Sequence, residues 1–177
     1  KTDKQKKGLE ELKRALQLDP QDWRIYMELG MNAYGTARYQ EAASNWEQAL
    51  KLEPDNVVAL RDLGAVYHML ERDDDAANAF QRALEIKPDA DTYNNLGTLR
   101  FYQGRYQDSV PAFEKTIALQ ANSYENWGNL ADAYRWSPGN AEKAKQAYQH
   151  AIQLIGEEIA KNPDDLDRAA RRAARSS

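Results

Sequence analysis

The sequence predicts an all-α fold in which antiparallel helix pairs stack as a repeat solenoid. First, the pattern Leu-Gly, Ala, aromatic, Ala, Pro returns every 33 or 34 residues. Second, each half of the pattern has helical spacing: a large apolar residue, Leu and a small residue at i, i+3 and i+4, then Ala, aromatic and Ala at i, i+4 and i+7. Third, Gly30, Gly64 and Gly97 recur inside helices, where Gly costs about 0.5–1 kcal/mol relative to Ala, which indicates close helix contacts.

The pattern assigns each stretch of the chain to a helix. We expect helices at residues 3–18, 22–35, 39–52, 56–70, 73–86, 89–102, 106–119, 122–136, 140–161 and 164–175. In the first of them, Leu12, Ala15 and Pro20 are spaced as in the second half of the later copies. Residues 3–18 are therefore predicted to be the second helix of an incomplete pair, and we expect the chain to be a segment of a longer protein.

Local signals mark the predicted helix ends. Asp22, Asn56 and Asn122 precede helical patterns, where a side-chain oxygen can accept from a free backbone N–H. Pro111 lies inside a predicted helix, so a bend or a late start near Ser109 is expected there.

The repeat resembles that of the tetratricopeptide repeat (TPR) family. The second copy meets every position of the family pattern, with Leu60, Leu63, Gly64, Tyr67, Ala76, Phe80, Ala83 and Pro88. Other copies depart at single positions, such as Ala33 and Arg100 in place of Tyr and Ala131 in place of Gly. The resemblance covers roughly residues 8–160 and implies a right-handed superhelical solenoid of about 10 helices.

The same register divides the chain into segments. We predict the second helix of a truncated repeat at 1–19, four TPR units at 20–54, 55–88, 89–121 and 122–162, the last with an extended second helix, and a capping helix or truncated next repeat at 163–177. In the final segment, Leu166 and Ala170 belong to a stripe of small residues, whereas Arg168 and Arg172 belong to a charged one. A solvated cap or truncated repeat explains this helix better than a nucleic-acid or lipid patch, because the arginines carry no interleaved aromatic residues.

Composition and motifs give no reason to expect several classes of function. The chain has 177 residues, no Cys and a formal net charge of −4, which gives no reason to expect nucleic acid or Cys-based chemistry, and no apolar run is long enough for a membrane span. His68 and His150 lie in different repeats, and Asp73, Asp74 and Asp75 fit a helix start. We therefore predict a soluble non-enzyme without cofactor or metal; the compartment stays open, with the cytoplasm favoured.

The family resemblance implies that the first helices of successive repeats line a concave groove. Helical spacing selects candidate groove residues that point away from the core: Arg24, Met27, Met31, Arg61, His68, Met69, Asn94, Asn95, Phe101, Tyr102, Asn129, Arg135 and Trp136. Asn95 and Asn129 share one position in adjacent copies, and a row of side-chain amides can pair with the backbone of an extended peptide. Hydrogen bonding to neighbouring helices or water explains both equally well.

The groove residues also indicate what it would bind. Of the basic and Asn clamp with which TPR domains grip chaperone C-termini, only Arg61 and Asn95 match, whereas Ala65, Glu125 and Asn129 do not. The Met and aromatic residues mixed with acids suit a partly apolar segment that carries some positive charge.

Two functions follow. We favour a protein-interaction scaffold that binds an extended peptide or helix of a partner protein in the groove. The alternative is a structural or regulatory accessory segment of a larger bacterial signalling protein, suggested by a loose resemblance around Trp127 and Trp136. Such a segment would self-associate through its open solenoid ends, for example as a homodimer.

Overall fold

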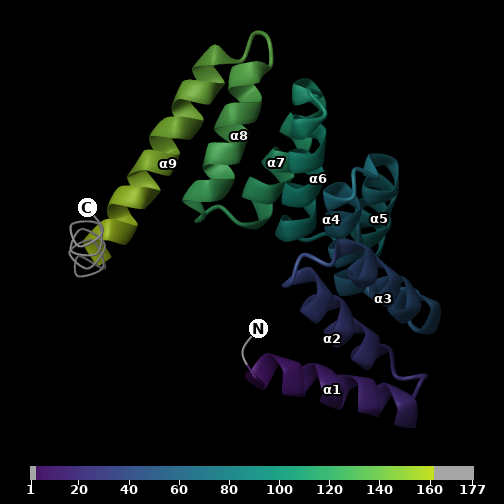
Figure 1. The fold of residues 1–177 in the computed structure, drawn as a ribbon. Coiled ribbons are helices and arrows are strands. Elements are labelled where there is room, and N and C mark those ends of the chain that lie inside the picture. The colour runs from purple at the N-terminus through teal and green to yellow at the C-terminus, as the bar shows by residue number, and fades with distance from the viewer. Residues whose placement is uncertain (1–2, 162–177) are drawn as a thin grey trace. The chain divides into compact units, whose positions relative to one another are not determined.

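The computed structural model describes residues 3–161, which form nine α-helices (Figure 1). They are α1 (Asp3–Leu18), α2 (Trp23–Tyr34), α3 (Tyr39–Leu52), α4 (Val57–Met69), α5 (Asp73–Ile86), α6 (Ala90–Tyr102), α7 (Tyr106–Leu119), α8 (Tyr124–Trp136) and α9 (Ala141–Lys161). The chain divides into two compact units, residues 1–99 and 100–177, and the boundary falls within α6. We call α2, α4, α6 and α8 the first helices and the odd-numbered ones the second helices.

The helix ends agree with the sequence expectation to within two residues. One local prediction was wrong, and one of two alternatives given for another does not occur. The N-cap of α8 is Ser123 rather than Asn122, and its hydroxyl accepts from the Asn126 N–H at 3.1 Å. The helix with Pro111 does not start late but begins at Tyr106, so a bend at Pro111 is the alternative that stays a prediction. The expected helix at 164–175 lies outside the described residues.

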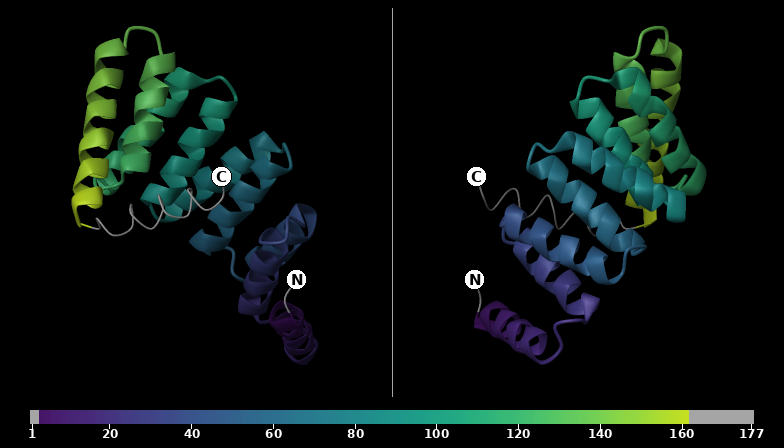
Figure 2. Two further views of the ribbon diagram at one scale, coloured as in Figure 1. Left: turned by 60° about the vertical axis from the view of Figure 1, so that its left-hand side comes forward. Right: turned by 90° about the vertical axis from the view of Figure 1, so that its right-hand side faces the viewer.

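The core of the first unit explains the repeated Gly and aromatic positions. In Figure 2, α2 lies side by side with α3, and α4 with α5. Trp46 and Phe80 are each 1% exposed and pack between these helices. A Cβ atom built on Gly30 would lie 2.4 Å from Trp46 Nε1, and one on Gly64 would lie 2.6 Å from Phe80 Cε1. Only glycine leaves room for the aromatic ring at these two positions.

The second unit is built in the same way around Phe113, which packs with Leu130, Ala131 and Tyr134. Here α8 pairs with α9, but α9 has 21 residues and α8 only 13, so α9 continues beyond its partner (Figure 1). Ile155 and Ile159, in the continuing part, are exposed.

Each turn from a first to a second helix contains one residue with positive φ. These residues are Ala37 (φ 56°), Glu71 (φ 58°), Gly104 (φ 73°) and Gly139 (φ 80°). In the first three turns the next residue is Arg, and its N–H donates to the carbonyl five residues earlier at 2.9 Å. These three turns therefore share one geometry, which the sequence meets with glycine only at Gly104.

Candidate functional site

All the predicted groove residues lie on first helices, but the structure divides them between the two units. Those on α2, α4 and the first part of α6 belong to the first unit, and those from Phe101 onward to the second. The exposed ones are Arg24, Met31, Met69, Tyr102, Arg135 and Trp136; the half-buried ones are Met27, Arg61, His68, Asn94, Asn95, Phe101 and Asn129. Met27 is half-buried because it packs against the core around Trp46.

In the first unit, Arg61 is held by two acidic side chains. Its Nε donates to Asp62 Oδ1 at 3.3 Å, and its Nη1 lies 3.5 Å from Asp91 Oδ2. Burial raises the pKa of Asp62, and the adjacent Arg61 opposes the shift. Arg61 is therefore engaged by two carboxylates, and the three side chains together carry an excess of one negative charge.

His68 belongs to a contact that recurs between the end of a first helix and the start of the next second helix. His68 Nδ1 lies 2.9 Å from Asp73 Oδ1. The corresponding contacts are aromatic: the ring centroids of Tyr34 and Tyr39 are 5.7 Å apart, and those of Phe101 and Tyr106 are 5.0 Å apart. In this position, the repeat of α4 and α5 thus presents a polar pair where its neighbours present rings.

The second unit has a continuous row of aromatic side chains, which we call the aromatic row: Tyr102, Phe101, Tyr106 and Trp136. Centroid distances along it are 6.2, 5.0 and 5.5 Å, and the last pair is stacked at 27°. Its two ends are the most exposed, with Tyr102 at 74% and Trp136 at 56%. Because the rings support one another from α6, α7 and α8, they form a preorganised apolar surface.

Arg135, on α8, interacts with Tyr148 on α9. The Tyr148 hydroxyl donates a short hydrogen bond to Asp132 Oδ1. Burial raises the pKa of Tyr148, the bond to Asp132 raises it further, and Arg135 opposes the shift. The guanidinium of Arg135 therefore already interacts with a neighbouring side chain of the second unit.

The two predicted amides are placed separately. Asn95 is half-buried in the first unit, and Asn129 is half-buried in the second. Each is thus a candidate contact within its own unit.

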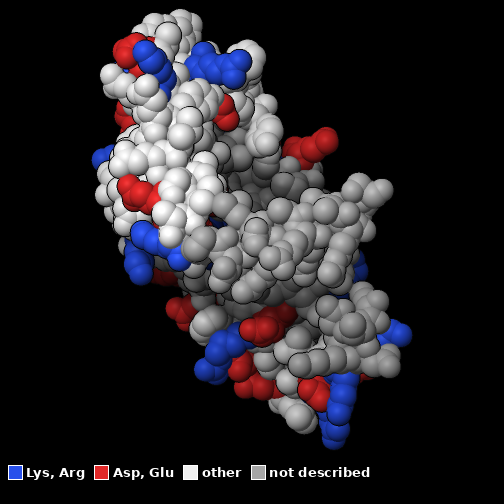
Figure 3. All heavy atoms as spheres, turned by 90° about the vertical axis from the view of Figure 1, so that its left-hand side faces the viewer, with Lys and Arg blue, Asp and Glu red and all other residues white. Residues whose placement is uncertain are grey.

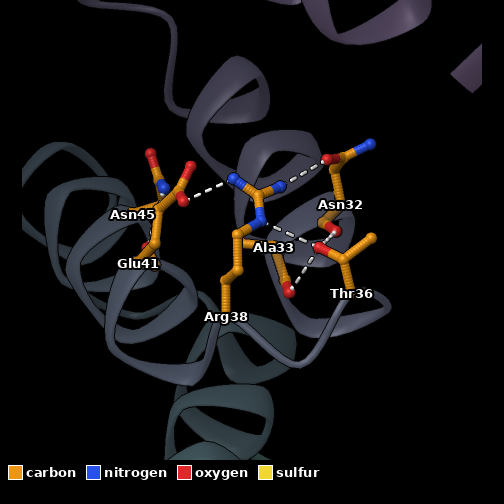
Figure 4. Close-up of polar contacts among 6 residues, drawn as sticks. All are labelled: Asn32, Ala33, Thr36, Arg38, Glu41 and Asn45. Carbon is orange, nitrogen blue, oxygen red and sulfur yellow. Dashed lines mark hydrogen bonds and ion pairs between the residues drawn. The ribbon is translucent and has the colours of Figure 1, made fainter. Parts of the chain in front are cut away.

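Sequence reasoning missed an Arg–acid pair at each of the first three turns between a first and a second helix. In Figure 4, the guanidinium of Arg38 contacts three side chains. Its Nη2 donates to Asn32 Oδ1 and its Nε donates to Thr36 Oγ1, both at 2.9 Å, and its Nη1 pairs with Glu41. Arg72–Asp75 and Arg105–Asp108 repeat the pair at 2.8 and 2.7 Å. The signal was present in the sequence, because Arg is followed three residues later by an acid at each of these turns.

A second missed feature is a Tyr–Glu hydrogen bond between consecutive repeats. The Tyr67 hydroxyl donates to Glu47 at 2.9 Å, and Tyr134 donates to Glu114 at 2.6 Å; both pairs are 20 residues apart. Burial and the acceptor Glu47 raise the pKa of Tyr67 to about 12, and Tyr134 shifts in the same direction for the same reasons. These bonds tie neighbouring helix pairs rather than form a reactive site.

The described residues offer little for metal or membrane chemistry. Among them, no group of three or more His, Asp or Glu side chains could hold a metal ion. None of the helices within residues 3–161 is long and apolar enough to cross a bilayer. On the face drawn in Figure 3, the described basic and acidic side chains are interspersed.

Comparisons with known proteins agree with this architecture. Two family models, both described as tetratricopeptide repeat, match residues 27–91 and 88–155. Among solved structures, a crystal structure of MamA has a TM-score of 0.80 at 22% identity and covers 86% of this chain and 89% of its own. MamA from Desulfovibrio magneticus RS-1, residues 41 to the end, has a TM-score of 0.75 at 19% identity, with coverage of 89% and 88%. At these identities the likeness shows the fold alone. No curated protein matches the sequence.

Proposed function

Because the chain belongs to the tetratricopeptide repeat family, whose repeats support a general role as a protein-interaction scaffold, we propose that it binds a partner peptide or helix on the exposed surface of its first helices. The observation that carries this proposal is the aromatic row. Tyr102 and Trp136 expose 74% and 56% of their surface, yet their rings are held by packed neighbours. Preorganised aromatic side chains lose little conformational entropy on binding, and such residues dominate binding energy at interfaces.

The first unit contributes a different surface to the proposed function. Met31 and Met69 are 56% and 49% exposed on α2 and α4, and flexible thioether side chains adapt to varied apolar partners. Asp62 and Asp91 leave a negative excess around Arg61. The ligand class that fits is a segment with large apolar side chains and at least one Lys or Arg.

A binding experiment tests the proposal directly. Peptides selected from a phage-displayed random library against the whole chain are titrated into the wild type and into the double variant Tyr102→Ala/Trp136→Ala. Removing two aromatic anchors should weaken binding by at least tenfold, because hot-spot truncations cost about 2 kcal/mol or more each.

Leu119→Ala is the matched control. Leu119 lies on the second helix α7. Its exposed fraction, 54%, is similar to the 56% of Trp136, so it is an exposed apolar side chain on a different helix. The control variant should bind as the wild type does. Equal binding by the double variant, or an equal loss in the control, would contradict the proposal.

A further inference from the structure

A recess of about 500 Å³ lies in the second unit, between the second helices α7 and α9. Its floor is the buried face of α8, which packs against both of these helices (Figure 1) and contributes Leu130 and Tyr134. Ile117 on α7 and Ala147 on α9 add apolar surface to its walls. Its lining residues are all different from those of the aromatic row. The recess is therefore a second surface of this unit, and its volume lies in the range of ligand sites in proteins.

The recess has an aromatic end and a polar end. At the aromatic end, the ring centroids of Trp127 and His150 are 4.2 Å apart. At the polar end, the ammonium group of Lys143 lies 5.3 Å from the centroid of the Tyr134 ring, and the Tyr134 hydroxyl donates to Glu114. Trp127 and Tyr134 are seven residues apart on α8, as are Lys143 and His150 on α9. Two helical turns, or about 10 Å, therefore separate the two ends.

At the aromatic end, the two units satisfy equivalent backbone carbonyls with different side chains. In the first unit, Arg82 Nη2 donates to the carbonyl oxygen of Pro54 at 2.7 Å. In the second unit, the corresponding carbonyl oxygen of Ala121 accepts from Trp127 Nε1 at 2.8 Å. His150 takes the position of Arg82 in the repeat, and its ring contacts that of Trp127. The second unit thus has an aromatic surface where the first unit has a guanidinium group.

At the polar end, the charge pattern of the turn is changed. In the first three turns, Arg is followed three residues later by an acid, and the two side chains pair, as Arg72 does with Asp75 at 2.8 Å. The corresponding residues of the fourth turn are Asn140 and Lys143. Lys143 is exposed and makes no ion pair within residues 3–161. Its ammonium group is therefore available to an anionic group of a ligand.

The polar side chains on the α9 wall also favour an acceptor on the ligand. Lys143, Gln146 and His150 line the recess from one face of α9, at spacings of three and four residues, and each can donate a hydrogen bond. Glu114, on the opposite wall, already accepts from the Tyr134 hydroxyl. A ligand carboxylate would therefore find its partner at Lys143, on the α9 side of the recess.

We propose that this recess binds an extended acidic segment of a partner protein, with an aromatic side chain against Trp127 and a carboxylate at Lys143. In a polyproline II segment, residues three apart lie on the same side and about 9 Å apart, which matches the separation of the two ends. The expected ligand therefore has an aromatic residue and an Asp or Glu three positions apart. The recess and the aromatic row are separate surfaces, so each proposal can fail without the other.

NMR chemical-shift mapping of the full chain with two capped peptides tests the proposal. The first peptide, Ac-Ser-Phe-Ser-Ser-Glu-Ser-NH2, carries the two groups three residues apart, and the second has Gln in place of Glu. At millimolar concentration, the Glu peptide should shift the indole N–H signal of Trp127 and the backbone signals of residues 143–150. The Gln peptide should bind about two- to fivefold more weakly, which is the effect of one exposed ion pair.

A pair of single variants locates the carboxylate. Lys143→Met should bind the Glu peptide only as tightly as the wild type binds the Gln peptide. Lys145→Met is the matched control, because Lys145 is an exposed residue of the same helix that does not line the recess. This control should bind both peptides as the wild type does.

A double variant tests the aromatic end. Trp127→Leu/His150→Arg gives the recess the residues that the first unit has at these positions, Leu60 and Arg82. It should fold, because the same framework holds these residues in the first unit, and the new Arg should donate to the Ala121 carbonyl as Arg82 does to that of Pro54. The Glu peptide should no longer shift the signals of residues 143–149 in this variant.

The Glu peptide should bind Tyr102→Ala/Trp136→Ala as tightly as it binds the wild type. Loss of binding in that variant would place the peptide on the aromatic row and overturn the proposal. The proposal would equally be overturned by the absence of shifts at Trp127 and residues 143–150, by equal binding of the two peptides, by equal effects of Lys143→Met and Lys145→Met, or by wild-type binding in the double variant of the recess.

Discussion

Gly64→Ala should destabilise the protein although it places a better helix former in the middle of α4. The new Cβ atom would lie 2.6 Å from Phe80 Cε1 and 2.7 Å from Phe80 Cδ1, whereas carbon atoms in contact are about 3.5–4.0 Å apart. Phe80 is 1% exposed in a close-packed core, so its ring has little room to move by the required ~1 Å. Overpacking of this kind costs about 1–3 kcal/mol, and the gain in helix propensity returns at most about 1 kcal/mol.

The net expectation is a loss of about 1–2 kcal/mol of unfolding free energy, measured from the urea midpoint and slope. Gly128→Ala is the matched control, because Gly128 lies inside α8 and a Cβ atom there meets nothing within 4 Å. It should gain about 0.5–1 kcal/mol. In a Phe80→Leu background the penalty of Gly64→Ala should shrink, because the smaller side chain leaves room for the methyl group. If Gly64→Ala stabilised the protein as much as Gly128→Ala does, the argument that Phe80 requires glycine would be refuted.

Three other predictions follow from the packing. Phe80→Ala should cost about 3–5 kcal/mol in urea unfolding through the cavity that it leaves; a loss below about 1 kcal/mol would contradict its place in the core. The pKa of Tyr67 is raised from 10 to about 12, so its contribution to stability is complete below pH 10 and is lost as the pH rises through 12. Tyr67→Phe should therefore flatten the fall in melting temperature between these pH values. An unchanged profile would disprove the stabilising role of the Tyr67 hydroxyl. Asn95→Ala/Asn129→Ala should weaken capture of library-selected peptides while leaving the melting temperature nearly unchanged, whereas equal capture would remove both amides from the binding surface.

The helices were predictable because their signals are local. The spacing of Leu63, Gly64 and Phe80 identifies helix faces, and Asp22 and Asn56 cap α2 and α4 as expected, accepting from Arg24 N and Ala59 N. The N-cap of α8 was missed because two adjacent residues of capping type, at 122 and 123, compete for one position. The sequence pattern does not distinguish between them.

The candidate site was predictable only in part, because charge pairing depends on contacts between helices. Spacing places Arg61 on the surface of α4, but its pairing with Asp91 joins two different helices and sets the local charge. The stacking of Tyr106 on Trp136 likewise depends on the packing of α7 beside α8. Helical spacing identified Trp136 as a candidate groove residue. Only the structure shows that Tyr106 stacks on its ring and so joins it to the aromatic row.

We propose that the repeated positions maintain the fold and that the exposed residues of the first helices bind the partner. Hydrogen–deuterium exchange of the full chain, with and without a library-selected peptide, tests it most directly. We expect added protection in α2, α4, α6 or α8, at the residues beside Met31, Met69, Tyr102 or Trp136, with unchanged exchange in α3, α5 and α9. Protection concentrated in these second helices, with none in the first helices, would contradict it.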